Sequence, residues 1–258
     1  VTLDGLSVAG KSTLAQMLLE RSADAVVISE NRLDPLRPAT SRLNKMFKAD
    51  PNIAYTAALD RLATESSQFA SFVKGAQGYV QRLQFDMDLA AQQQATLAYF
   101  FAAGRSLVNQ LFVSREIQKR DVILDRWRAS GVYQAQPAAH GEGYAYSPQE
   151  ILALNIQMGV CSPDMQVILT CPAEQIPQRK AYRQKEGAGT AGQMSTGREP
   201  IIYKAFMETL AWLQANGKPV IHIENDGTPV EQLEEQVRQA IPSYLTLESA
   251  LRDSMDGR

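Results

Sequence analysis

Residues 1–13 read VTLDGLSVAGKST, and this stretch decides the class of fold. The apolar run at residues 1–4 predicts a short buried strand, and residues 11–21 carry leucines and a methionine at helical spacing. Between them the sequence matches the pattern G-x-x-x-x-G-K-[ST], a loop whose backbone N–H groups wrap around phosphate oxygens. Because the motif requires a strand before it and a helix after it, and both are predicted here, we interpret it as a P-loop.

Each residue of this loop has an expected task in binding a nucleoside triphosphate. The glycines let the backbone turn inward, and the helix that follows presents its positive N-terminal end. Lys11 is expected to reach the outer phosphates from a solvated position, and Ser12 is expected to ligate Mg²⁺. The residues predicted to bind the nucleotide are Gly5, Ser7, Val8, Ala9, Gly10, Lys11, Ser12 and Thr13.

Apolar runs of strand length alternate with helical patterns along the rest of the chain. After the first strand they lie at residues 25–28, 121–125, 165–169 and 219–223, and a helix is predicted over 230–241. This alternation predicts an α/β fold, a doubly wound five-stranded parallel sheet. Residues 37–88 lack a strand pattern and are rich in Ala, Gln, Ser and Arg, which indicates a helical insertion at about 38–90, with partial disorder as the alternative. We expect one domain over residues 1–258.

Composition excludes several other classes of protein. A formal net charge of −2 and a pI near 5.8 give no general attraction to nucleic acid or to an anionic membrane. No run approaches the roughly 20 apolar residues of a membrane span, and no targeting signal is recognised, so a cytoplasmic location is expected. Two cysteines and two histidines show no metal-ligand spacing. The predicted partner is a small nucleotide, and a homodimer is left open.

An acid and an arginine directly follow the predicted strand at residues 121–125. Ligands of open α/β sheets bind at the carboxyl ends of strands, where Asp125 and Arg126 therefore lie. Arg126 suits an anion clamp, and Asp125 suits the metal ion or the attacking group. A local Asp–Arg pair at a strand end is the structural alternative.

Taken in order, these and further motifs resemble the thymidylate kinase family. That family has a strand ending in an acid and a glycine, a helix reading roughly Phe-Ala-Ala-Asp-Arg, an Asp-Arg-Tyr with a nearby Ser and Tyr-Gln pair, and a lid helix with an acid and arginines. The matching residues are Leu3-Asp4-Gly5, Phe101-Ala102-Ala103-Gly104-Arg105, Asp125-Arg126-Trp127, Ser130, Tyr133-Gln134, Pro163-Asp164, Glu174, Arg179 and Arg183.

The resemblance implies a kinase that uses ATP and Mg²⁺, held by Lys11 and Ser12. It further implies that Phe101 stacks on the acceptor base, that Arg105 meets the base edge or the acceptor phosphate, and that Arg126 holds that phosphate. The acceptor site expected on this basis comprises Asp4, Glu30, Phe101, Arg105, Arg126, Ser130, Tyr133 and Gln134.

A lid is expected at about residues 179–198. Members of the family without an arginine in the P-loop place the catalytic cation in the lid, and residues 6–9 contain no arginine. The resemblance therefore assigns this cation to Arg179 or Arg183, with Lys180 as a further candidate.

Three departures from the family pattern leave the acceptor open. Trp127 replaces the usual tyrosine, Gly104 replaces the acid before Arg105, and Ser29-Glu30-Asn31-Arg32 stands where the family has Arg-Glu-Pro-Gly-Gly. We predict phosphoryl transfer to a nucleoside monophosphate, with dTMP first. Glu30 equally fits a deoxynucleoside kinase, in which such a carboxylate acts on a 5′-hydroxyl. A nucleotide-binding regulatory module without kinase activity is the third possibility.

Overall fold

A five-stranded parallel sheet forms the centre of the molecule, as a computed structural model shows. The structure describes residues 1–6, 8–21, 24–83, 87–139, 143–185 and 198–240. The strand order is β2-β3-β1-β6-β7, and every pairing is parallel. The strands are β1 (Thr2–Gly5), β2 (Ala25–Ser29), β3 (Asp121–Asp125), β6 (Gln166–Thr170) and β7 (Val220–Glu224). All the predicted strands and the doubly wound parallel sheet are confirmed.

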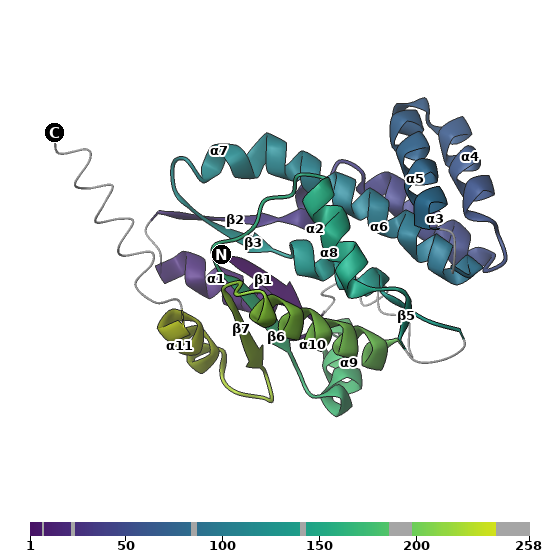
Figure 1. Ribbon diagram of the computed structural model, residues 1–258. Helices are drawn as coiled ribbons and strands as arrows, with labels where there is room; N and C mark the ends of the chain where they lie inside the picture. Colours follow the sequence, from purple (N-terminus) through teal and green to yellow (C-terminus); the bar gives the residue numbers. More distant parts are fainter. Residues whose placement is uncertain (7, 22–23, 84–86, 140–142, 186–197, 241–258) are drawn as a thin grey trace.

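Helices cover both faces of this sheet (Figure 1). On one side, α1 (Lys11–Arg21) and α11 (Val230–Ala240) contact each other and the strands next to them. On the other side, α10 (Glu199–Ala215) packs on β6 and β7, and the 3₁₀ segment η4 (Arg128–Gln134) packs on β1. The remaining elements on this side and at the strand ends are β4 (Gln136–Pro137), β5 (Tyr144–Tyr146), α8 (Pro148–Gln157), η5 (Ala173–Gln175) and α9 (Ile176–Lys185).

The segment predicted as a helical insertion is helical in the structure. Within it, α3 (Arg37–Ala49), α4 (Tyr55–Glu65), η1 (Ser67–Phe69) and α5 (Ala70–Leu83) gather at one end of the molecule, away from β7 and α11 (Figure 1). The short helix α2 (Glu30–Leu33) precedes this segment. The long helix α6 (Leu89–Val108) follows it, and then η3 (Asn109–Val113), a π-helical turn, and α7 (Ser114–Glu116) lead to β3. Among the described residues, no helix combines the length and the apolar character needed to cross a membrane.

One hydrophobic cluster joins the sheet to these helices. Leu3 and Val167 on the central strands are fully buried, and they belong to the same cluster as Leu43, Leu59 and Val73 on α3, α4 and α5. Burial of apolar surface is the main stabilising term in folding. The helical segment is therefore packed into the core rather than attached at its surface.

Two helices that carry site residues begin with side-chain caps. The Asp88 carboxylate accepts a hydrogen bond from the Ala91 N–H at the start of α6. At α8, the Ser147 hydroxyl accepts from the Glu150 N–H while the Glu150 carboxylate accepts from the Ser147 N–H, which is a capping box. Such caps satisfy N–H groups that have no partner within the helix, and they determine where α6 and α8 begin.

Candidate active site

The residues of interest meet at the carboxyl ends of the sheet strands. Gly5 ends β1, Glu30 follows β2, Asp125 ends β3 with Arg126 directly after it, and Asn225 follows β7. Parallel strands bring their carboxyl ends to one edge of the sheet, which is where ligands bind in open α/β folds. The residues predicted at these strand ends are therefore brought to one edge of the sheet.

The loop after β1 has a backbone that only glycine adopts readily at two positions. Gly5 has φ +128° and Gly10 has φ +95°. A Cβ atom at Gly5 would lie 1.8 Å from the Leu169 carbonyl oxygen of β6. Gly5 is therefore required both by its dihedral angle and by the close approach of β6. Within this loop Val8 and Ala9 are buried, and the expected binding residue at position 7 lies outside the described part of the chain.

Lys11 is buried, and the expectation that it is solvated is wrong. Its side chain is 4% exposed, and its Nζ donates to the carbonyl oxygens of Gly5 at 2.9 Å and Leu6 at 2.5 Å. The loop folds over the first turn of α1, so that the carbonyl groups of Gly5 and Leu6 cover the Lys11 ammonium group. Ser12 and Thr13, the next residues of α1, are exposed.

Ser12 and Asp125 form an oxygen-rich pair across the site. Ser12 Oγ lies 3.4 Å from Asp125 Oδ2, and Asp125 Oδ1 is buried without a hydrogen-bond partner in the described structure. A buried carboxylate oxygen without a partner costs free energy unless a cation or a donor satisfies it. Hard cations such as Mg²⁺ prefer hydroxyl and carboxylate oxygens. The pair therefore fits the expected metal ion in chemistry and in position.

Asp4 is fully buried behind the site. Its Oδ1 accepts hydrogen bonds from the Trp127 N–H at 2.8 Å, from the Ser130 N–H at 2.8 Å and from the Ser130 hydroxyl at 2.6 Å. Its Oδ2 accepts from Gln166 Nε2 at 3.1 Å. Asp4 and Ser130 were expected to bind substrate, but these contacts instead tie the turn after β3 to β1 and β6. The geometry makes them positioning residues, because their polar groups are already used within the protein.

Arg126 stands on the turn that Asp4 holds. It is the one described residue other than glycine with a positive φ, at 68°, a conformation that persists where the surroundings enforce it. The Arg126 N–H donates to the Leu3 carbonyl at 3.0 Å, and the guanidinium carbon lies 5.8 Å from the centre of the Tyr133 ring. Tyr133 in turn donates its hydroxyl to the Gly5 carbonyl at 3.0 Å. Tyr133 therefore links Arg126 to the P-loop. Gln134 follows at the half-buried end of η4.

Arg105 is buried and already has partners. Its Nε lies 3.1 Å from Glu30 Oε1, and its Nη1 donates to Asn155 Oδ1 at 3.2 Å. Its guanidinium carbon lies 5.9 Å from the centre of the half-buried Phe101 ring, which is on the same face of α6. Three of the residues expected at the acceptor site, Phe101, Arg105 and Glu30, are therefore brought together.

Glu30 has a strongly altered acidity. Its pKa is raised to about 7: burial is the main cause, Arg105 acts in the opposite direction, and the nearby Asp34 carboxylate adds to the rise. A carboxyl group with a pKa near neutrality can exchange a proton at working pH, which is typical of general acid–base groups.

A carboxylate from another segment occupies the space beside Gly104. A Cβ atom at Gly104 would lie 2.1 Å from Asp34 Oδ1 and 2.6 Å from its Cγ. Asp34 Oδ1 also accepts a hydrogen bond from the Leu36 N–H at 2.8 Å, which fixes the carboxylate at the start of α3. The Asp34 carboxylate therefore fills the space that a side chain at position 104 would need.

Arg179, on α9, contacts the back of the P-loop. Its Nη1 donates to the Val8 carbonyl at 3.4 Å, and its Nη2 donates to the Asn225 carbonyl at 2.8 Å. Asn225 Nδ2 donates to the Ala9 carbonyl at 3.0 Å. Of the expected lid, Lys180 forms an ion pair with Glu199, while the Arg183 side chain and residues 186–197 lie outside the described part of the chain.

Sequence reasoning missed three residues of this arrangement, namely Asp34, Asn155 and Asn225. Asp34 precedes a proline and Asn225 begins an Asn-Asp-Gly turn, so both carried a turn signal. Neither signal indicates a contact with Gly104 or with the P-loop, because both contacts join segments far apart in the chain. Asn155 carried no signal that distinguishes it from other residues of α8.

The fold and the loop together define a P-loop NTPase architecture. More particularly, a solved thymidylate kinase shares this fold. The enzyme from Candida albicans is similar with a TM-score of 0.57 at 16% identity, over 94% of this chain and 90% of that one. The enzyme from Ehrlichia chaffeensis gives a TM-score of 0.49 at 15% identity, over 93% of this chain and 96% of that one. No protein-family model and no curated protein sequence matches the chain. The resemblance predicted from the motifs is thus confirmed at the level of the fold.

Proposed function

We propose that this protein is an ATP- and Mg²⁺-dependent kinase that phosphorylates a nucleoside monophosphate, with dTMP as the first acceptor to test. The observation that carries the proposal is the meeting of three groups at one sheet edge: the P-loop, the Ser12–Asp125 oxygen pair and the Arg126 guanidinium. These groups suit the donor phosphates, the metal ion and an acceptor phosphate, respectively. The fold shared with thymidylate kinases supports the same assignment.

On the donor side, Lys11 and the loop N–H groups bind the phosphates. The Lys11 ammonium now donates to carbonyl oxygens of its own loop. Phosphate oxygens are stronger acceptors for a charged donor, so the flexible side chain turns to them when ATP binds. Ser12 and Asp125 would hold Mg²⁺, which would supply positive charge beside the donor phosphates.

On the acceptor side, Arg126 holds the phosphate of the monophosphate. A guanidinium offers two parallel donors to a phosphate, and Tyr133 beneath it limits the orientations it can take. Asp4 fixes the turn that carries Arg126 through hydrogen bonds to the next residue and to Ser130. Catalysis then rests on positioning and charge neutralisation, with no covalent intermediate on the protein.

A thermal-shift panel of nucleosides and nucleoside monophosphates, with and without a non-hydrolysable ATP analogue, tests this proposal. A ligand that binds only the folded state raises the melting temperature, and at equal concentration a tighter ligand raises it more, because the stabilisation grows with the logarithm of concentration over Kd. We expect dTMP to give the largest shift, and the shift to decrease in Arg126→Lys. Stabilisation by ATP analogue alone, with no response to any acceptor, would favour the regulatory module.

A deoxynucleoside kinase is the second candidate, and Glu30 is the observation that favours it. A buried carboxyl group with a pKa of about 7 at the end of β2 can accept the proton of a 5′-hydroxyl. Such an acceptor brings no negative charge, so its binding depends little on Arg126. Stabilisation by thymidine that persists in Arg126→Lys, without stabilisation by dTMP, identifies this alternative.

A further inference from the structure

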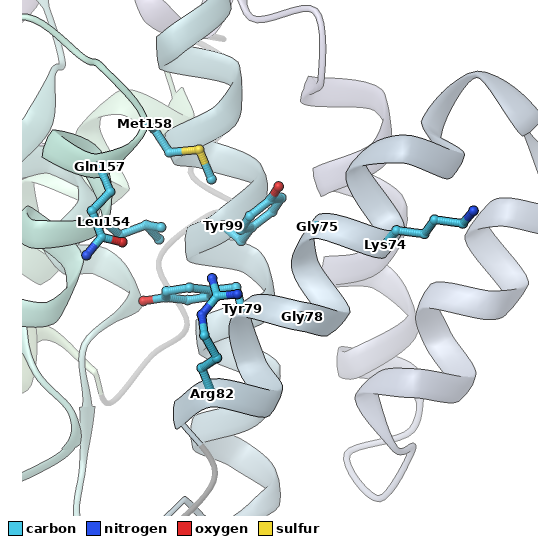
Figure 2. Close-up of a pocket in the computed structure, with 9 residues that line it drawn as sticks. All are labelled: Lys74, Gly75, Gly78, Tyr79, Arg82, Tyr99, Leu154, Gln157 and Met158. Carbon is cyan, nitrogen blue, oxygen red and sulfur yellow. The ribbon is translucent and has the colours of Figure 1, made fainter.

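A cavity lies between α5, α6 and α8, apart from the strand ends. Its volume is about 340 Å³, and its lining includes Gly78 and Arg82 on α5, Tyr99 on α6 and Gln157 on α8 (Figure 2). Tyr99 and Arg105 are six residues apart on α6, and at about 100° per residue they project from different faces of that helix. The cavity is therefore separate from the acceptor region around Arg105.

Aromatic rings and helix backbone form the walls of this cavity. The Tyr79 and Tyr99 rings lie with centroids 5.9 Å apart at an interplanar angle of 37°. A Cβ atom at Gly75 would lie 1.9 Å from the Tyr99 hydroxyl oxygen, so the glycine lets this ring lie directly against α5. At Gly78, the nearest atom to an added Cβ is Arg82 Nη1 at 3.8 Å, an ordinary van der Waals distance. Glycines weaken a helix interior. Here Gly75 makes room for the Tyr99 hydroxyl, and Gly78 borders the part of the cavity that lies between α5 and Tyr99, called the slot below.

The charge of the cavity is positive. Lys74 and Arg82 are among its lining residues, and the lining contains no carboxylate. Figure 2 shows Arg82 turned toward Tyr79 and α8, while Lys74 extends away. Within the described part of the chain, no hydrogen bond or ion pair of the Arg82 guanidinium is found. Burial raises the pKa values of Tyr79 and Tyr99, and the positive charge of Arg82 partly offsets this rise. An exposed guanidinium beside a flat aromatic wall suits an anionic group attached to a planar ring.

We propose that this cavity is a second ligand site, which binds a small anion bearing one planar ring system, of the class of pyrimidine nucleoside monophosphates. The volume lies at the lower end of the range of about 300–1,000 Å³ for ligand pockets, which favours a single ring over a purine dinucleotide. The ring lies in the slot between Gly78 and Tyr99, the phosphate contacts Arg82, and the Gln157 amide offers polar contacts to the ring edge. The inference does not depend on the kinase assignment, because no residue of the strand-end site lines this cavity.

A titration of ¹⁵N-labelled protein with UMP, followed by amide chemical shifts, locates the binding directly. Amides of Gly75, Gly78 and Gln157 report the cavity, whereas the amide of Gly10 reports the P-loop. We expect saturable shifts at the cavity amides, and binding at least about tenfold weaker for uridine, which lacks the phosphate contact to Arg82. Shifts confined to Gly10 and the strand ends would overturn the proposal.

Three variants sharpen this test. Arg82→Gln removes the charge and is expected to weaken the cavity binding at least about tenfold. Gly78→Leu places a branched side chain in the cavity from a position where an added Cβ meets no atom closer than 3.8 Å, and should abolish the shifts at Gly75 and Gln157. Arg42→Gln removes an exposed arginine of α3 outside the lining and should leave UMP binding unchanged. Equal affinity in Arg82→Gln and in the wild type would refute a site of this chemistry.

Discussion

At the scale of single residues, Lys11 connects stability and function. Lys11→Ala should abolish phosphoryl transfer, because the charged donor for the outer phosphates is lost. We expect the free energy of unfolding to fall by only about 1–2 kcal/mol, although two charge-assisted hydrogen bonds are removed. The reason is that Tyr133 still donates to the Gly5 carbonyl and the Ala9 N–H still donates to the Leu6 carbonyl.

Urea unfolding and ATP turnover measure these two effects, and Lys48→Ala on the exposed face of α3 is the matched control. The control should change neither quantity. Turnover of Lys11→Ala at the wild-type rate would exclude the P-loop as the donor site.

Glu30 makes stability depend on pH. Its pKa is about 7 in the folded protein and about 4.5 in the unfolded chain, so the folded state binds more protons between these values. Stability therefore falls as the pH rises from 4.5 to 7, by up to about 3 kcal/mol at roughly 1.4 kcal/mol per pKa unit. Glu30→Gln, which does not titrate, should flatten this part of the profile.

Urea unfolding of both proteins at several pH values between about 4.5 and 8 measures the difference. The diagnostic quantity is the slope of the free energy of unfolding against pH, since the loss of the Arg105 contact in Glu30→Gln shifts the whole curve. The same slope in both proteins would mean that Glu30 is not the group that titrates.

At the scale of elements, the turn between α2 and α3 packs closely against α6. The contact is between the Asp34 carboxylate and Gly104. A glycine-to-alanine change normally stabilises a helix by about 1 kcal/mol. Gly104→Ala should instead lower the free energy of unfolding by about 1–3 kcal/mol, because the new Cβ would lie 2.1 Å from Asp34 Oδ1. Asp34→Ala removes the obstructing atoms. The double variant should therefore lose less stability than the sum of the single variants.

A double-mutant cycle by urea unfolding measures this coupling. Gly78→Ala is the matched control, since the same change on α5 meets no atom closer than 3.8 Å and should be neutral or stabilising. Strictly additive effects of Asp34→Ala and Gly104→Ala would contradict the described packing.

The helix α9 contains the two arginines that are expected to supply the catalytic cation of the lid. Arg179→Ala and Arg183→Ala should each depress kcat more than ATP affinity, because a cation that meets developing charge acts mainly in the transition state. For arginines of this kind losses reach about a thousandfold. Asn225→Ala removes a neutral contact to the same loop and should mainly raise KM for ATP.

Steady-state kinetics of the three single variants and of the double arginine variant separate these effects. Full activity in both arginine variants and in their double variant would place the catalytic cation elsewhere.

At the scale of the whole molecule, the features that can be predicted from the sequence are those that depend on residues close together in the chain. The P-loop, the strands and the final helix follow from short motifs and apolar runs, and the helical character of residues 37–83 follows from composition. The burial of Lys11, the saturation of Asp4 and the contact of Asp34 with Gly104 could not be predicted. The last two depend on the packing of segments that are distant in sequence, which no local pattern encodes. The burial of Lys11 depends on how its own loop folds over it, which the spacing of the motif does not specify.

The central claim is that the strand-end site transfers the γ-phosphoryl group of ATP to an acceptor nucleotide. Incubation with γ-labelled ATP, Mg²⁺ and either dTMP or thymidine, followed by separation of the labelled products, tests it most directly. We predict labelled dTDP from dTMP, no labelled product from thymidine, and loss of the dTDP in Lys11→Ala. Labelled dTMP from thymidine alone would contradict the monophosphate acceptor, and no labelled nucleotide from either acceptor would contradict the assignment as a thymidylate-type kinase.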